Sequence, residues 1–417
     1  MLAALREEFN RNFTPEKYRR FLNNLDRACA THVEFPVSET PCFVPASLLE
    51  KMARYGRELV LQLVDNPEYR RLSDATIPEK YNVPNEAPLP MFVQVDFGLV
   101  RGADGELEPK LVELQAFPSL YGYQPTSAHQ YVESYGLSHD LGIYLSSLDD
   151  GSYWRLMRQL IVADHDPENV ILMEIDPQHQ KTLPDFLVTQ RKLGIAIVDI
   201  LSLEKRGRKL FYRDKEDGRE IEVRRIYNRC IVDELERKGI ALPFDMREEL
   251  DVEWAGHPNW YFRISKFSIP YLKHPSVPKT WFLDQLDELP SDNENYLLKP
   301  LYSFAGVGIK FSPTKSDIDA IPSDQRHNYI LQERLRFEPV IQTPHGPTQM
   351  EIRMMFVWPQ SPQRAKSGHA GGPEQERGEL TPVLPLVRMG RGIMMGVDHN
   401  KNLEWVGGSA ALTLKGS

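Results

Sequence analysis

The chain has 417 residues, two to three times the usual length of a single domain, and this length predicts two or three domains. Its 50 Lys and Arg against 59 Asp and Glu give a formal net charge of −9, which argues against polyanion binding and makes nucleic acid a poor partner. No apolar run is long enough to cross a bilayer, and residues 1–13 lack the apolar segment of a secretion signal, so no membrane association is expected. The cysteines Cys29, Cys42 and Cys230 are widely spaced, which favours a reduced, cytoplasmic setting.

Two amphipathic helices are predicted near the start of the chain. Thr14 and Pro15 place a capping residue before a proline at the first helical position, and the apolar spacing that follows predicts a helix over residues 15–29. Ser47 and Glu50 fit a capping box, and apolar residues at helical spacing after them predict a second helix that ends near residue 65.

Residues 91–115 predict a β-hairpin around the turn at residues 103–105, because apolar and polar residues alternate on both sides of that turn. The pairing brings Asp96 to the same side as Glu113 and Gln115. Two carboxylates and an amide oxygen are hard ligands suited to a Mg²⁺ ion that also holds nucleotide phosphates. The alternative, of similar weight for these residues alone, is that the carboxylates solvate the exposed face of a sheet.

The middle of the chain reads as a βαβ unit. Strands over residues 169–174 and 195–201 flank a helix over 183–193, which suggests a parallel pair. An exposed hairpin is expected over 205–223, and Ile226 and Tyr227 return to the sheet. Arginines follow at positions 224, 225 and 229, where Arg229 and its neighbours either receive an anionic substrate or, more commonly for such a cluster, form a solvated strand face.

The most informative segment lies near residue 300, where a strand that ends in Lys299 enters a turn with Gly306 and Gly308. Glycines let backbone N–H groups approach phosphate oxygens, and a lysine on the adjacent strand adds a point charge, so this segment is suited to phosphate binding. It is neither a Walker A loop nor a dinucleotide fingerprint, and an ordinary hairpin is the alternative. Around it we expect a helix near 265–273, strands at 296–299, 307–311, 329–332 and 351–358, and an insertion over 360–381.

Two further strands carry polar groups toward this segment. The backbone at residues 333–335 can read an adenine edge, Glu351 can accept a hydrogen bond from a ribose, and Arg353 can pair with a phosphate. A cross-strand surface ion pair is the alternative role of Glu351 and Arg353.

Together these residues resemble the ATP-grasp superfamily, whose pattern runs from a strand lysine and a glycine-rich flap through a Gln-Glu hinge and an acid-x-Arg strand to a closing acidic magnesium motif. The closing motif is missing after the Gly-Gly stretch at 407–408, and a similar motif stands instead at residues 95–119. The order is rotated, so the chain resembles circularly permuted members of the family, among them glutathionylspermidine synthetase-like proteins. The residues that match the family pattern are Lys299, Gly306, Gly308, Gln332, Glu333, Glu351, Arg353, Arg388, Asp96 and Glu113.

The resemblance implies an α+β fold: an ATP-grasp fold in circularly permuted order, with an α/β, pre-ATP-grasp-like substrate domain inserted. The expected parts are 1–150, with helices and the magnesium-binding strand pair, 151–255, the α/β substrate domain, and 256–417, the nucleotide-binding subdomains. Gln115 departs from the family, which has asparagine at this place, and this puts the metal geometry in doubt.

The resemblance also implies roles for single residues. Lys266, with Lys273 as the alternate, is expected to contact phosphate, while Arg353 and Arg388 are the expected catalytic groups, Arg388 at the γ-phosphate or acyl-phosphate. The expected ATP-binding residues are Lys266, Lys299, Gly306, Gly308, Gln332, Glu333, Leu335 and Glu351; the expected Mg²⁺ ligands are Asp96, Glu113 and Gln115; and the substrate side holds Ser119, Tyr121, Tyr123 and Arg229.

The implied activity is an ATP- and Mg²⁺-dependent ligase that joins a carboxylate to an amine or a thiol through an acyl-phosphate. Its partners would be a small-molecule carboxylate and an amine, or a peptide. Two alternatives stay open, an ATP-dependent phosphotransferase and a nucleotide-binding protein without turnover. A metal-dependent hydrolase is the least supported, because His and Cys clusters at metal spacing are absent from the sequence. The acid, the nucleophile and the oligomeric state are not readable from the sequence.

Overall fold

The structure of the chain is a computed structural model that describes residues 1–302, 308–359, 378–395, 400 and 402–415. Helices and strands are mixed, and the described strands form four sheets. The α+β class is as the sequence predicts. No helix in the described ranges is both long and apolar enough to span a membrane.

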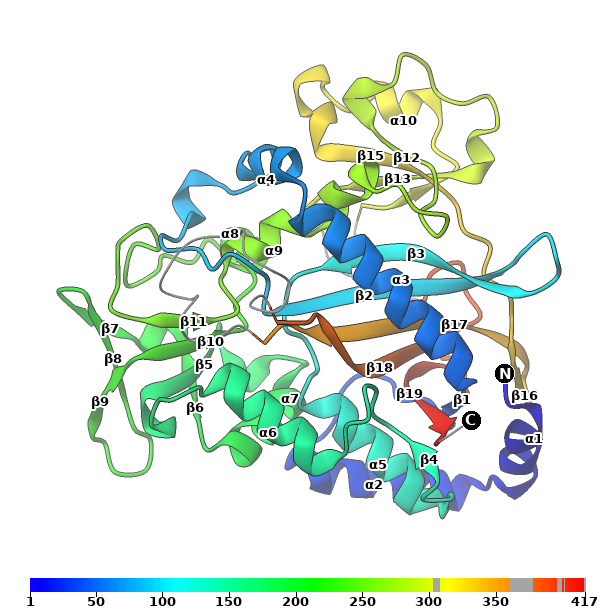
Figure 1. Cartoon of the computed structure of the whole chain (residues 1–417), viewed down its shortest axis with the longest axis horizontal. Helices are drawn as coiled ribbons and strands as arrows, with labels where there is room; N and C mark the ends of the chain where they lie inside the picture. The colour runs from blue at the N-terminus through cyan, green and yellow to red at the C-terminus, as the bar shows by residue number, and fades with distance from the viewer. Residues whose placement is uncertain (303–307, 360–377, 396–399, 401, 416–417) are drawn as a thin grey trace.

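The largest sheet combines strands from the N-terminal and the C-terminal parts of the sequence (Figure 1). Strand β2 pairs antiparallel with β3, as the hairpin prediction requires, and its other edge pairs antiparallel with β17, more than 240 positions further along the chain. The order along the sheet is β1 (Cys42–Phe43), β19 (Gly407–Leu414), β18 (Thr381–Gly390), β17 (Gly346–Val357), β2 (Phe92–Arg101) and β3 (Leu107–Gln115), while β16 (Ile341–Thr343) pairs with β17 and β4 (Leu141–Gly142) with β19.

Helix α3 (Ala46–Val64) covers one face of this sheet, and Figure 1 shows it lying across β2 and β17. The predicted helix is confirmed, but its predicted capping box is not formed, because Pro45 is the N-cap and no side chain bonds the first turn. The apolar stripe of α3 packs on the alternate, apolar residues of β2 and β17 in one buried cluster. Successive side chains of a strand point to opposite faces, so the polar residues of the same strands are left for the other face.

The second sheet belongs to the middle of the chain and contains the predicted βαβ unit. Strands β5 (Val170–Glu174) and β6 (Ala196–Asp199) are parallel and joined by α7 (Leu183–Leu193). The sheet continues through β10 (Arg225–Asn228) and β11 (Glu253–Ala255), both parallel to their neighbours. The hairpin expected over 205–223 is part of a three-stranded sheet of β7 (Glu204–Arg206), β8 (Lys209–Arg213) and β9 (Glu220–Val223).

Helices cover the remaining faces. The predicted helix over 15–29 is α2 (Pro15–Cys29), with the Thr14 hydroxyl accepting a hydrogen bond from the Lys17 backbone N–H. Its buried residues join the cluster formed by α5, α6 and α7. The other helices are α1 (Ala3–Asn12), α4 (Pro67–Asp74), α5 (Tyr123–Tyr135), α6 (Asp150–Ile161), α8 (Val232–Lys238), α9 (Asn259–Arg263) and α10 (Lys315–Asp319).

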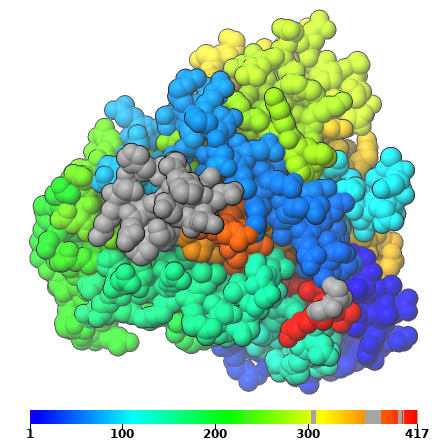
Figure 2. Space-filling model, viewed as in Figure 1, coloured from blue at the N-terminus to red at the C-terminus, as the bar shows by residue number. Residues whose placement is uncertain are grey.

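A small antiparallel sheet forms a separate lobe, which projects at the top of Figures 1 and 2. Its order is β12 (Thr280–Phe282), β15 (Tyr329–Glu333), β13 (Tyr296–Pro300) and β14 (Lys310–Phe311). The prediction of a helix near 265–273 is corrected: the segment is a six-residue 3₁₀ helix, η5 (Lys266–Tyr271), because Pro270 removes a backbone donor and limits an α-helix. The strand expected over 307–311 begins at Lys310, and most of the insertion expected over 360–381 lies outside the described residues.

Candidate functional site

The polar face of the large sheet carries a buried network of charged side chains. Asp96 of β2 lies directly opposite Arg353 of β17, and Glu351 lies opposite Arg388 of β18. Arg353 donates two hydrogen bonds to Asp96, Nε to Oδ1 at 2.6 Å and a terminal nitrogen to Oδ2 at 2.7 Å. Arg388 also pairs with Asp96, and it lies 2.6 Å from Glu351 Oε1. The alternation that places apolar residues under α3 therefore brings three predicted site residues together around one carboxylate.

The electrostatics of this network favour an ionised Asp96. Burial opposes ionisation, but the guanidinium groups of Arg353 and Arg388 outweigh it and hold the pKa of Asp96 below its ordinary value. Burial raises the pKa of Glu351, against the pull of Arg388. Burial would lower the pKa of Arg388, yet the carboxylates of Glu351 and Asp96 raise it. Arg388 thus stays charged between the two carboxylates.

The small sheet faces this network with a lysine and an amide. The Nζ atom of Lys299 donates a hydrogen bond to Oε1 of Gln332 at 2.5 Å across β13 and β15. Burial, aided by the nearby charge of Lys266, lowers the pKa of Lys299 to about 8 against the attraction of Glu113 and Glu351. Helix η5 presents Lys266, whose Nζ lies 3.8 Å from Oε1 of Glu113. The two lysines and the two arginines therefore approach one region from different elements.

A cavity of about 600 Å³ lies between the two sheets. Six cationic and four anionic side chains line it, which leaves an excess of positive charge. Two buried donors there, Nε2 of Gln332 and Nε of Arg388, have no hydrogen-bond partner among the described residues, and such donors call for ligand acceptors. The predicted site residues on its wall are Asp96, Glu113, Gln115, Ser119, Lys266, Lys299, Gln332, Glu333, Leu335, Glu351, Arg353 and Arg388.

Three predicted substrate residues, Tyr121, Tyr123 and Arg229, do not line the cavity. Tyr121 is buried, and its hydroxyl donates to the backbone carbonyl of Phe356 at 2.7 Å. Arg229 is also buried and pairs with Asp185. Tyr121 anchors the loop after β3 to the sheet, Tyr123 is buried, and Arg229 holds a carboxylate of α7, so this geometry does not support their predicted contact with substrate.

The glycine turn is only partly described. Gly308 has a left-handed backbone, with φ of +78°, and does not line the cavity. Gly306 lies outside the described residues. Their phosphate-binding role stays a prediction.

The donor groups on β3 determine which metal would fit. Glu113 is about one-third exposed. Gln115 donates from Nε2 to Oε1 of Gln94 at 2.7 Å, which leaves its own oxygen as the end of the amide turned away from Gln94. Both oxygens of Asp96 already accept from arginines. No three His, Cys, Asp or Glu side chains of the described chain gather as they would around a metal ion. This set fits a Mg²⁺ ion that takes most of its ligands from phosphate and water, not one held by protein alone.

The sequence reasoning missed several residues on the cavity wall. Arg334 and Arg336 follow the predicted hinge, and their spacing of two along an extended segment could have suggested that both face one side. Ile393, Met394 and Met395, which follow β18, add apolar surface and carry no comparable signal.

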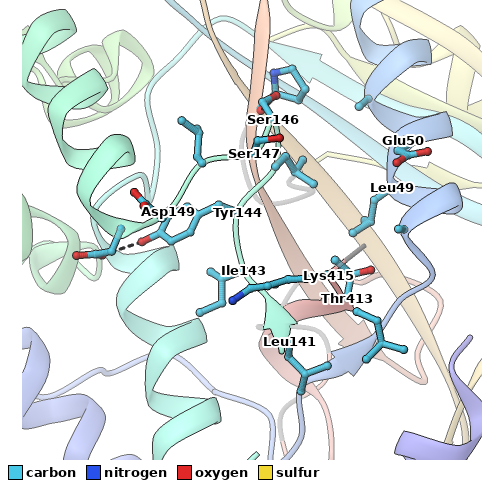
Figure 3. A pocket seen from close by; sticks show the side chains of 18 of the residues that line it. Leu49, Glu50, Leu141, Ile143, Tyr144, Ser146, Ser147, Asp149, Thr413 and Lys415 are labelled. Atoms are coloured by element: carbon cyan, nitrogen blue, oxygen red, sulfur yellow. Dashed lines mark hydrogen bonds between the residues drawn. The ribbon is translucent and has the colours of Figure 1, made fainter. Parts of the chain in front are cut away.

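A larger cavity, of about 950 Å³, lies elsewhere, between α3, residues 141–149 and the end of β19 (Figure 3). The labelled side chains around it include Leu49, Tyr144 and Thr413. None of the predicted site residues lines it. The candidate site is therefore assigned by its convergent charges and orphaned donors and not by its size.

The comparisons with known proteins bear on the fold. No family model matches the chain, and no curated protein matches it. The solved structure of a glutathione synthetase-like effector, GSS30, from Globodera pallida in its apo form aligns with a TM-score of 0.60 and 12% identity over 96% of this chain and 98% of that chain. A candidate gamma-glutamylcysteine synthetase from Methylobacillus flagellatus aligns with 14% identity over 83% of this chain and 89% of that chain, but its TM-score of 0.31 carries no argument. The first likeness shows that this chain shares the fold of the glutathione synthetase-like effector.

Proposed function

We propose that the protein is an ATP- and Mg²⁺-dependent ligase that joins a carboxylate to an amine through an acyl-phosphate. The observation that carries the proposal is the cavity itself: twelve residues chosen from distant segments of the sequence line one wall, with an excess of cations and two unsatisfied buried donors. An anionic ligand with several acceptors, such as a nucleoside triphosphate, complements such a wall. The shared fold with a glutathione synthetase-like effector is further support.

The proposed reaction has two steps. A carboxylate oxygen of the substrate attacks the γ-phosphorus of ATP and ADP leaves; the amine nitrogen then attacks the acyl carbon and phosphate leaves. Lys266 and Lys299 would neutralise phosphate charge, and Arg353 and Arg388 would stabilise the transferred group. Mg²⁺, held by Glu113 and Gln115, would supply further charge neutralisation and orient the phosphates. No side-chain nucleophile is needed.

We also propose that the chain is a circularly permuted ATP-grasp protein. The support is the pairing of β2 with β17, because it joins the acidic strand pair from residues 92–115 to the strands that follow the flap. On this proposal the parts are 1–150, 151–255 and 256–417, with the parallel sheet of β5, β6, β10 and β11 in the middle part.

A second candidate function is a nucleotide-binding protein without turnover. The observation that favours it is Asp96, whose two carboxylate oxygens accept hydrogen bonds from arginines that would compete with a metal. Gln115, in place of asparagine, points in the same direction. A phosphotransferase that acts on a hydroxyl is distinguished from the ligase by trapping with hydroxylamine, because only an acyl-phosphate yields a hydroxamate.

The first experiment is a thermal-shift series with ATP, GTP and ADP, each with and without Mg²⁺. A ligand that binds only the folded state at about one hundred times its Kd adds about 2.7 kcal/mol of stability, which is readily seen as a rise in Tm. An ADP-release screen with amino acids, peptides and polyamines, run with and without hydroxylamine, then separates the candidates. Hydroxamate formation supports the ligase, ATP stabilisation without ADP release in any mixture supports the silent protein, and no stabilisation by any nucleotide would refute both.

A further inference from the structure

A chain of two side-chain amides links the loop after β3 to the cavity. Gln94 of β2 lies opposite Gln115 of β3, and it is completely buried. Its Nε2 atom donates to the backbone carbonyl of Ser119 at 2.6 Å. Since a carbonyl only accepts hydrogen bonds, this contact fixes the nitrogen of Gln94 toward Ser119 and turns its oxygen toward Gln115.

The orientation of Gln94 sets that of Gln115. The Oε1 atom of Gln94 can only accept, and Gln115 meets it with Nε2 at 2.7 Å. The oxygen of Gln115 is then the end of the amide turned away from Gln94. Because residues two apart on a strand share a face, that oxygen belongs to the same side of β3 as the carboxylate of Glu113, and both residues line the cavity.

The far end of this chain is itself held firmly. Asp185 accepts hydrogen bonds from the backbone N–H groups of Leu120, Gly122 and Tyr123, at 3.2, 2.7 and 2.9 Å. Arg229 pairs with the same carboxylate, and both members of the pair are almost completely buried. The Ser119 carbonyl therefore has a fixed position from which Gln94 can be oriented.

We infer that Gln94 is a positioning residue that presents the side-chain oxygen of Gln115 to a divalent cation, so that glutamine serves where a shorter amide is expected. The inference rests on the proposed function, because it requires a nucleotide-bound cation at Glu113. A free glutamine amide can present either its oxygen or its nitrogen, and only the oxygen binds a hard cation. Fixing the amide thus removes the unproductive one of its two orientations, in which an N–H group would face and repel the cation.

The alternative is that the two glutamines merely satisfy each other in the sheet. Both roles predict some loss of stability when Gln94 is changed. They differ in whether changing Gln94 still weakens cation binding when the side chain at position 115 can bind the cation in either orientation. A glutamate at position 115 has this property, because either carboxylate oxygen can bind a metal.

The test measures Mn²⁺ binding by electron paramagnetic resonance in the presence of a non-hydrolysable ATP analogue. The proteins are the wild type, Gln94→Met, Gln115→Glu and the double variant, each with an unliganded Tm as a control for folding. Loss of a group that orients a metal ligand typically costs tenfold or more in affinity, so Gln94→Met is expected to weaken Mn²⁺ binding about tenfold. In the Gln115→Glu background a carboxylate cannot donate to Oε1 of Gln94, so the same substitution is expected to cause no loss of Mn²⁺ affinity.

Two outcomes overturn the inference alone, provided that the wild-type protein binds Mn²⁺. One is an unchanged Mn²⁺ affinity in Gln94→Met, and the other is an equal loss of affinity in both backgrounds. Wild-type protein that binds neither the analogue nor Mn²⁺ overturns the proposed function as well. Should Gln94→Met fail to fold, Gln115→Leu takes its place. It removes the oxygen and is expected to lose about as much affinity, whereas an unchanged affinity there refutes the oxygen as a ligand.

Discussion

The protonation of Lys299 gives a quantitative prediction about nucleotide binding. Burial lowers the pKa of this lysine to about 8, so in the free protein about half of the molecules carry its charge near that pH. A bound triphosphate favours the charged form and raises the pKa again. Nucleotide binding above pH 8 must therefore be accompanied by uptake of a proton.

The size of the effect follows from the two protonation states. Below about pH 7 the lysine is charged before binding, and the affinity does not depend on its titration. Between about pH 7 and pH 9 the charged fraction of free protein falls about tenfold, and the affinity is expected to fall by the same factor, or about 1.4 kcal/mol. Isothermal titration calorimetry with a non-hydrolysable ATP analogue and Mg²⁺, in buffers of different ionisation enthalpy, measures both the affinity and the proton uptake.

The matched control is Lys299→Arg, which keeps the charge at every pH used. This variant is expected to lose the pH dependence and the proton uptake, whatever its affinity. The difference between wild type and variant removes the titration of the nucleotide and of other groups. Equal slopes in the two proteins, or a wild-type affinity that is constant from pH 7 to pH 9, would refute the assignment of Lys299 to the phosphates.

Three further predictions concern stability, each measured by urea unfolding. Lys299→Met is expected to stabilise the ligand-free protein by up to about 3 kcal/mol at pH 7. Since the pKa of the lysine in the folded state lies below its pKa in the unfolded state, wild-type stability rises as the pH increases from about 8 to 10.5, and the advantage of the variant fades over that range. Equal stability of variant and wild type at pH 7 would contradict a buried charge on Lys299. Asp96→Asn leaves Arg353 and Arg388 without their shared carboxylate and is expected to lower the free energy of unfolding by about 3–5 kcal/mol. A loss below about 1 kcal/mol would show that the network is solvated. Arg229→Met leaves the buried carboxylate of Asp185 unpaired and is expected to lower the free energy of unfolding by a similar amount, about 3–5 kcal/mol. An unchanged stability would exclude the Arg229–Asp185 pair as an anchor of the loop after β3.

Local patterns in the sequence predict much of the fold. The helix over 15–29, the hairpin over 91–115 and the βαβ unit are confirmed because each depends on a periodicity and a nearby turn or cap. The errors arise where a neighbour changes the local preference. Pro270 shortens an expected helix to a 3₁₀ turn, and Pro45 occupies the cap position that Ser47 was expected to define.

The site is predicted less evenly. Residues in a motif with alternate spacing, such as Glu351 and Arg353, reach the cavity because strand periodicity fixes their face. The resemblance places Tyr121 on the substrate side because it follows the metal-binding strand, but the chain has left the strand there and the tyrosine is buried in the core. The pairing of Gln94 with Gln115 depends on sheet register with a bulge after Asp96, which no short pattern shows.

The assembly of the site also bears on the proposed circular permutation. Asp96 and Arg353 are 257 positions apart in the chain, yet they are direct neighbours in the ladder between β2 and β17. The entropy of closing a loop grows only with the logarithm of its length, so the cost of bringing these strands together depends weakly on which of them comes first or how far apart they lie. The stabilisation from pairing a buried carboxylate with two guanidinium groups depends on strand register, because only the correct register places the partners opposite each other. A partner left unpaired in the sheet is strongly destabilising. A site that depends on register in this way tolerates a change of chain order, provided that both strands are present.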